Sequence, residues 1–181
     1  MYQMMNDPRS GLCVSRAQET LADYARSRAL MKPPVRIESV AEWMGFQVIL
    51  LYTVGEEFSG MVSVRQKLIG VNGQHHRHRR RFTIGHELAH ILLKHPPESH
   101  CTPKEIALYN VEADACAAEL LMPASLLSRW LPMTRSISNL AYAFDVSEEA
   151  MKVRLRELRQ AGCFTVGTDS IARLRKSEIP T

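Results

Sequence analysis

Long hydrophobic runs are absent from this chain of 181 residues. No stretch of 18 consecutive apolar residues occurs, so we expect no transmembrane helix. Residues 1–16 are polar and lack the apolar core of a secretory signal peptide. With 45% hydrophobic and 23% charged residues, the composition is that of an ordinary globular protein.

Closely spaced cysteines are absent as well. The four cysteines, Cys13, Cys101, Cys116 and Cys163, are scattered and form no C-x-x-C pair. This favours free thiols over a disulfide framework, so we expect a protein of the reducing cytoplasm. The length supports one domain, or one domain with a small appendage.

Charge of one sign is only mildly in excess, because the net charge is +4. Its densest cluster, the basic run, consists of Arg77, Arg79, Arg80 and Arg81 with His75, His76 and His78 interleaved. Such a run can bind an anion or a nucleic acid, and its histidines can bind a metal or stabilise an oxyanion. We favour the plainer interpretation, a solvated loop that leads into the next helix.

The most informative motif follows this run: His86-Glu87-Leu88-Ala89-His90, an H-E-x-x-H pattern. On a helix, positions i and i+4 lie on one face, so His86 and His90 can offer two imidazole nitrogens to one metal ion. Glu87 projects beside them and can take a proton from a water molecule. This is the arrangement of zinc peptidases, with two ligands and a general base on one helical turn.

The rest of this helix is apolar. At 3.6 residues per turn, its polar side chains fall in one stripe about 100° wide. Such a helix is normally buried, and burying an unpaired polar group costs about 2–7 kcal/mol. Since a cation satisfies both histidines, we expect a metal site rather than a surface helix with two solvated histidines.

Catalytic zinc has three protein ligands, so a third must come from elsewhere. A metzincin would need Gly and His where Leu93 and Pro96 stand, which excludes that class. His95 lies five residues after His90, so we expect it to point away from the polar stripe, near the C-terminus of the helix. A carboxylate from a second helix is the remaining option.

The second helix is predicted to begin with Thr102 as N-cap, Pro103 in its first turn and Glu105 completing a capping box, and to end at Pro123. Its carboxylates are Glu112, Asp114 and Glu119. Glu112 and Glu119 share a face about 10 Å apart, so one metal cannot bind both. We select Glu112 as the ligand. Glu119 is then a buried-edge or supporting carboxylate, and Asp114 is either a partner of a ligand histidine or solvated.

These residues resemble the ImmA/IrrE family of metallo-endopeptidases. The likeness spans about residues 18–160 and rests on two segments: Arg81-Phe82-Thr83 before the H-E-x-x-H motif, and Glu112-Ala113-Asp114 followed by Ala118-Glu119-Leu120-Leu121-Met122-Pro123. Thermolysin-like enzymes, which the constellation also resembles, place an Asp four residues after the ligand Glu to orient a histidine. That position is Cys116 here.

The predicted fold class is α+β: a mainly helical zincin-like core with a small three-stranded sheet, then a helix-turn-helix-like segment. We expect a poorly ordered N-terminus over residues 1–16, the peptidase core over 17–131, and the C-terminal segment over 132–181. Apolar and β-branched enrichment predicts the strands, and helical spacing or family likeness the flanking helices. The predicted strands are 47–51, 60–64 and 67–71; the flanking helices are 17–30, 37–44 and 124–131; the tail from Gly167 is expected to be mobile.

Two helices are expected around a turn at Asp145-Val146, with Ser147 capping the second. Basic residues on the outer face of that helix can meet DNA phosphates. Glu148 and Glu149 at its start oppose this. We therefore favour a helical cap on the core over a DNA-binding unit.

The resemblance implies a Zn²⁺-dependent endopeptidase in which His86, His90 and Glu112 bind the metal and Glu87 is the general base. Tyr109, one turn before Glu112, is a weaker oxyanion candidate. The implied partner is a protein substrate, typically a helix-turn-helix repressor in bacterial stress or mobile-element control. The alternatives are a DNA-binding regulator with a structural metal site and a toxin–antitoxin component.

An edge strand before the metal helix can bind an extended substrate.

Overall fold

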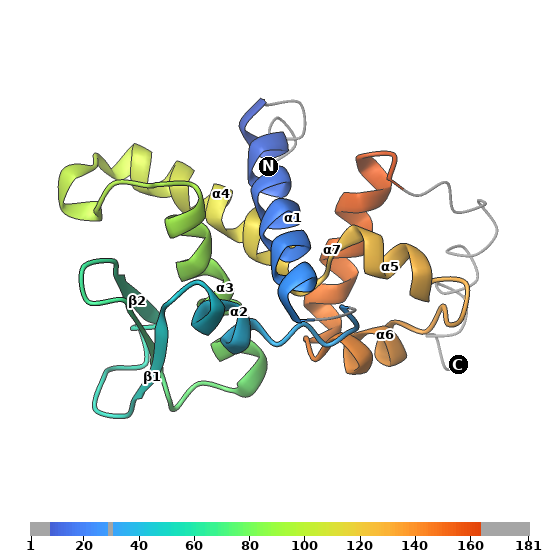
Figure 1. Ribbon diagram of the computed structural model, residues 1–181, viewed down its shortest axis with the longest axis horizontal. Helices are drawn as coiled ribbons and strands as arrows, with labels where there is room; N and C mark the ends of the chain where they lie inside the picture. The colour runs from blue at the N-terminus through green and yellow to red at the C-terminus, as the bar shows by residue number, and fades with distance from the viewer. Residues whose placement is uncertain (1–7, 29–30, 164–181) are drawn as a thin grey trace, which may run out of the picture.

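The computed structural model describes residues 8–28 and 31–163 (Figure 1). The described residues form seven α-helices, a short 3-10 helix and three strands. In chain order these are α1 (Pro8–Arg28), α2 (Ile37–Trp43), β1 (Gln47–Leu51), β2 (Gly60–Ser63), β3 (Leu68–Asn72), α3 (Arg77–Leu92), η2 (Glu98–His100), α4 (Pro103–Leu121), α5 (Ala124–Trp130), α6 (Ile137–Phe144) and α7 (Glu148–Gln160).

The sheet is mixed and has the order β1-β3-β2. β3 is parallel to β1 and antiparallel to β2. Val62 of β2 and Ile69 and Val71 of β3 point into the core, where the two β3 side chains are fully buried. β2 pairs only with β3 among the described strands, so one side of its backbone is an open edge.

The helix with the H-E-x-x-H motif, α3, lies between the sheet and α4 near the middle of the molecule (Figure 1). α3 and α4 approach closely at a pair of small residues. A Cβ placed on Gly85 would lie 3.3 Å from the Cβ and 3.5 Å from the Cα of Ala117. The absence of larger side chains at this crossing brings the functional faces of the two helices within reach of each other.

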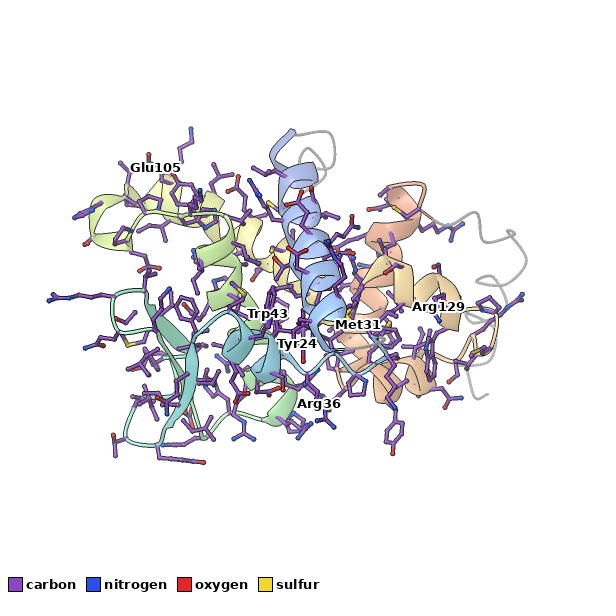
Figure 2. All side chains as sticks on the ribbon, viewed as in Figure 1. Tyr24, Met31, Arg36, Trp43, Glu105 and Arg129 are labelled. Atoms are coloured by element: carbon purple, nitrogen blue, oxygen red, sulfur yellow. The ribbon has the colours of Figure 1, made fainter. Side chains whose placement is uncertain are left out.

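The N-terminal helix α1 covers α4 and also contacts α3 and α2. Cys13, Ala17 and Leu21 recur at every fourth residue and are buried against this core. Tyr24 of α1 packs edge-to-face on Trp43 of α2, with ring centroids 5.8 Å apart (Figure 2).

α3 ends in a Schellman motif. Lys94 takes the left-handed conformation, with φ of 56°. The Lys94 amide donates to the carbonyl of Ile91, and the His95 amide donates to the carbonyl of His90 at 3.0 Å. The chain therefore turns back on itself, and His95 comes to lie beside His90.

α6 and α7 are joined by a tight turn of the same type. Asp145 is left-handed, with φ of 54°, and the amide of Val146 donates to the carbonyl of Ala141. Ser147 caps α7 by accepting a hydrogen bond from the amide of Ala150. Whether this pair of helices is a DNA-binding unit stays a prediction.

The predicted strands and the helix at 37–44 are confirmed to within one residue, and Thr102, Pro103 and Glu105 form the expected capping box. The expectation of poor order over residues 1–16 is wrong for residues 8–16, which are helical. The apolar face of this segment was not recognised in the sequence because Cys13 and Ala17, which are buried on it, have small side chains. The tail from Gly167 lies outside the described residues, and the domain boundaries stay predictions.

None of the helices in residues 8–28 and 31–163 combines the length and apolarity needed to cross a bilayer.

Candidate metal centre

The H-E-x-x-H residues lie in the second half of α3, as the spacing predicts. His86 and His90 are partly buried, and Glu87 is only 9% exposed. Three segments outside the motif surround them: β2, α4 with the side chain of Asp114, and the residues after the end of α3 with His95.

Asp114 holds the first histidine. Its Oδ1 lies 2.8 Å from Nδ1 of His86, so this nitrogen carries the proton and donates it. Burial lowers the pKa of His86, but the hydrogen bond and negative charge of Asp114 outweigh it and leave the pKa above its ordinary value. The bond also turns Nε2 of His86 away from α4, as carboxylate partners of metal-binding histidines do.

His95 holds the second histidine. Its Nδ1 lies 2.9 Å from Nδ1 of His90, and its Nε2 lies 3.0 Å from Oε2 of Glu112. The carboxylate accepts from Nε2–H of His95, and Nδ1 of His95 in turn accepts from Nδ1–H of His90. Burial and the neighbouring His86 and His95 lower the pKa of His90 to about 4, which favours the neutral ring that a metal ligand requires.

The predicted direction of His95, away from the polar stripe, is wrong, because its ring lies against His90. A helical projection beyond Leu92 places His95 off the polar stripe, but α3 ends there and the Lys94 turn reverses the chain. The ring of His95 is stacked on Tyr109 with centroids 4.4 Å apart. Tyr109 thus lies in the same cluster as Glu112, one turn before it.

Both histidines present their remaining nitrogens to the same point. Nε2 of His86 and Nε2 of His90 lie 3.0 Å apart. Two nitrogens bound tetrahedrally to zinc at 2.0–2.1 Å are separated by about 3.3 Å. The pair therefore fits a zinc ion after an opening of a few tenths of an ångström, and each ring is held from behind by its Nδ1 partner.

The described part of the structure defines no third ligand beside the two histidines. Among the described residues, no three His, Cys, Asp or Glu side chains are already arranged around one metal position. Oε2 of Glu112 lies 3.0 Å from Nε2 of His95. Glu112 is thus connected to His90 through one intervening ring, and its role as a ligand stays a prediction.

Glu87 faces the sheet, beside the edge strand. A Cβ placed on Gly60 of β2 would lie 3.4 Å from Oε1 of Glu87 and would collide with Thr83 at 2.4 Å. A glycine is therefore required for the strand to pass this close to α3. Burial raises the pKa of Glu87 to about 7, against the lowering influence of His86.

Glu119 has a structural role. It is fully buried and accepts hydrogen bonds from Nε2 of Gln18 at 3.1 Å and from the amide of Ala124 at 3.2 Å. Arg154 of α7 forms an ion pair with its other oxygen. Glu119 therefore joins α1, α4 and α7 and is directed away from the histidines.

The basic run is used within the fold and is not a free loop, because Arg77–Arg81 form the first turns of α3. Arg81 is 3% exposed and donates to the carbonyls of Val35 at 2.8 Å and Asp145 at 3.1 Å. Arg77 pairs with the carboxylate of Asp145 at 2.7 Å. Partial burial raises the pKa of Asp145, but the hydrogen bond from Arg77 and the positive charges of Arg81 and Arg77 lower it below its ordinary value.

A helix that carries His, Glu and His at this spacing is typical of metallopeptidases. The family model described as Peptidase_M78, IrrE N-terminal-like domain, matches residues 41–156. The match spans more than half of the chain, so the chain belongs to this family. The ImmA/IrrE resemblance is thereby confirmed.

Among solved structures, the fold is similar to a Mycobacterium tuberculosis transcriptional regulator, with a TM-score of 0.60 and 16% sequence identity. The similarity covers 78% of this chain and 46% of that one, so the chain spans about half the length of this relative. At this identity the likeness concerns the fold alone. No curated protein sequence matches the chain at a significant level.

Proposed function

We propose that this protein is a zinc-dependent endopeptidase that cleaves a protein substrate. The observation that carries the proposal is the convergence of the His86 and His90 Nε2 atoms, 3.0 Å apart, beside a buried glutamate. His86, His90 and Glu112 are the proposed ligands. A carboxylate can accept a hydrogen bond from His95 with one oxygen and bind a cation with the other.

A zinc ion bound there would supply Lewis acidity, which polarises a peptide carbonyl and acidifies water. The residues of the chain do the rest. Asp114 and His95 keep both ligand rings in the tautomer with an unprotonated Nε2. Glu87 takes the proton of the attacking water and passes it to the leaving amine. Tyr109 stays the candidate for oxyanion stabilisation.

The open edge of β2 is the proposed seat of the substrate backbone. An extended peptide can add to such an edge by main-chain hydrogen bonds. Gly60 places this edge against Glu87, so a peptide bound there would pass the general base. Following the family resemblance, a helix-turn-helix repressor is the substrate that we propose to test first.

The decisive test is Glu87→Gln in the full chain loaded with zinc. The amide preserves the shape but cannot accept a proton, so cleavage of a candidate repressor should fall by about 10²–10⁴-fold. Zinc content, measured by atomic emission, should stay equal to that of the wild type. Undiminished cleavage by the variant would refute the role of Glu87.

A DNA-binding regulator with a structural metal site is the second candidate. It is supported by the name of the similar mycobacterial structure and by the turn between α6 and α7. Against it, Arg77 is engaged by Asp145, and Glu148 and Glu149 occupy the first turn of α7. Specific DNA binding in a gel-shift assay, without proteolysis of any repressor, would favour this candidate.

A further inference from the structure

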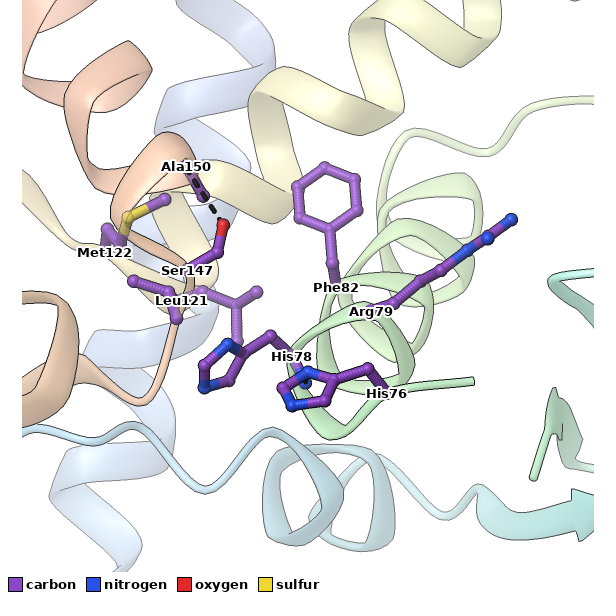
Figure 3. Close-up of a pocket in the computed structure, with 9 residues that line it drawn as sticks. His76, His78, Arg79, Phe82, Leu121, Met122, Ser147 and Ala150 are labelled. Atoms are coloured by element: carbon purple, nitrogen blue, oxygen red, sulfur yellow. Dashed lines mark hydrogen bonds between the residues drawn. The ribbon is translucent and has the colours of Figure 1, made fainter. Parts of the chain in front are cut away.

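A cavity of about 320 Å³ lies between the first turns of α3, the end of α4 and the start of α7 (Figure 3). Its floor is formed by Leu121 and Met122, which are buried. Phe82 stands on one side, and Ser147 and Ala150 of α7 stand opposite. The volume is at the lower end of the range for ligand pockets, about 300–1,000 Å³.

The cavity shares a face of α3 with the proposed metal ligands. Phe82 precedes His86 by four residues, so their side chains lie one above the other on the helix. The separation along the helix axis is about 6 Å. An extended peptide advances about 3.3 Å per residue, so the cavity lies about two residues from a peptide bond placed at His86.

The lining favours an apolar side chain. No Asp or Glu is among the cavity's lining residues. The apolar members are Phe82, Leu121, Met122, Val146 and Ala150, and the polar ones are His76, His78, Arg79 and Ser147. Each polar side chain of the lining has a partner. His76 accepts from the amide of His78 at 3.3 Å, and Nε2 of His78 lies 3.5 Å from the carboxylate of Asp145. Ser147 accepts from the amide of Ala150 at 3.1 Å, and Arg79 donates to Oγ of Ser59 at 2.9 Å. The start of α7 does not offer the Ala150 amide to an anion, because Ser147 already accepts its hydrogen bond.

We propose that this cavity is a specificity pocket that takes one large apolar side chain of the substrate, two residues from the bond that is cut. The proposal rests on the peptidase function proposed above. It gives α7 a role in substrate selection, because Ala150 forms the wall opposite Phe82. Ala150 and Phe82 then set the size of the side chain that fits.

The test uses the zinc-loaded full chain and a peptide library made by digesting a bacterial proteome, with cleavage sites mapped by mass spectrometry. The wild type should select a large apolar residue at one position, two residues from the cut. Ala150→Phe fills the pocket and should abolish this selection. For one selected peptide, kcat/KM should fall about tenfold or more, mainly through KM.

The matched control is Ala22→Phe, the same change at an exposed alanine of α1. It should leave the cleavage map unchanged. Ala150→Val adds only two methyl groups and should give an intermediate loss, which covers the case in which Ala150→Phe does not fold. Zinc content and the thermal midpoint are measured for every variant.

Two negative results are distinguishable. If the wild type cuts peptides without any preference at that position, or if both Ala150 variants cut with the selection and kcat/KM of Ala22→Phe, the pocket is refuted and the peptidase stands. If the wild type cuts neither peptides nor repressor, the proposed function fails and the pocket fails with it.

Discussion

Both halves of α3 carry polar side chains, and the two halves use them differently. In the first half, the guanidinium groups of Arg77 and Arg81 bind Asp145 and backbone carbonyls. These contacts hold the C-terminal helices in place. In the second half, the polar partners of His86 and His90 engage only the outer nitrogens, and the inner nitrogens converge. The groups around a side chain, more than its residue type, decide whether it stabilises the fold or leaves a nitrogen available to a metal.

Removal of one converging ring should have the largest effect. His90→Ala deletes a proposed ligand, so stoichiometric zinc binding should be lost, and cleavage with it. Zinc is measured by atomic emission after dialysis. His76→Asn, at the N-cap that precedes α3, is the control, since asparagine can still cap the helix and zinc should be retained. Equal zinc content in the two variants would contradict the proposed centre.

The anchoring half should respond in stability instead. Arg81→Met keeps most of the side-chain volume but leaves Asp145 and the carbonyl of Val35 without this buried donor. The free energy of unfolding should fall by about 3–5 kcal/mol, as measured by urea denaturation. Arg79→Met, at an exposed position in the same run, should change it by less than about 0.5 kcal/mol. A similar small change for both would show that Arg81 is no anchor.

Loss of the ring that positions His90 should have a smaller effect than loss of His90 itself. His95→Ala removes the partner of Nδ1, and zinc affinity should fall by about 10–100-fold, measured by competition with a chelating dye. His100→Ala, an exposed histidine in η2, is the control and should leave the affinity unchanged. An unaltered affinity in His95→Ala would mean that the histidine chain does not act on the metal.

The smallest effect concerns pH. Asp145→Asn retains a residue that tolerates the left-handed conformation and removes only the charge. Because the pKa of Asp145 is depressed in the folded protein, its charge stabilises the fold above the unfolded pKa of about 3.9. This contribution, about 1–2 kcal/mol at pH 7, is lost as pH falls through the folded pKa.

The wild type should therefore exceed Asp145→Asn in unfolding free energy at neutral pH and converge with it in acid. Asp23→Asn, in an exposed ion pair of α1, should show no comparable difference. A constant gap between the wild type and Asp145→Asn from pH 7 to pH 2.5 would exclude the charge as its cause.

Local patterns in the sequence predicted the helix of the H-E-x-x-H motif, the three strands and the Thr102 cap. These depend on residues within one or two turns of each other. His95 escaped because a lysine, where a glycine is the usual signal, takes the left-handed position that ends α3. Arg81 and Asp145 escaped because 64 residues separate them, and no periodicity encodes such a contact.

For Asp114 the sequence left two options open, a partner of a ligand histidine or a solvated side chain, and Asp114 contacts His86. Helix spacing alone could not settle this choice. It depends on how closely α4 approaches α3, which only the packing of both helices determines.

Because of this close approach, the hydrogen bond and the raised pKa of His86 depend on residues that do not contact its ring. Aspartate has a single methylene group, so its carboxylate reaches His86 only while the Gly85–Ala117 crossing keeps the backbones near. A chain with a bulkier pair at this crossing would need a glutamate in place of Asp114 to span the wider gap. The choice between aspartate and glutamate at this position is thus set by the distance between the two helix axes.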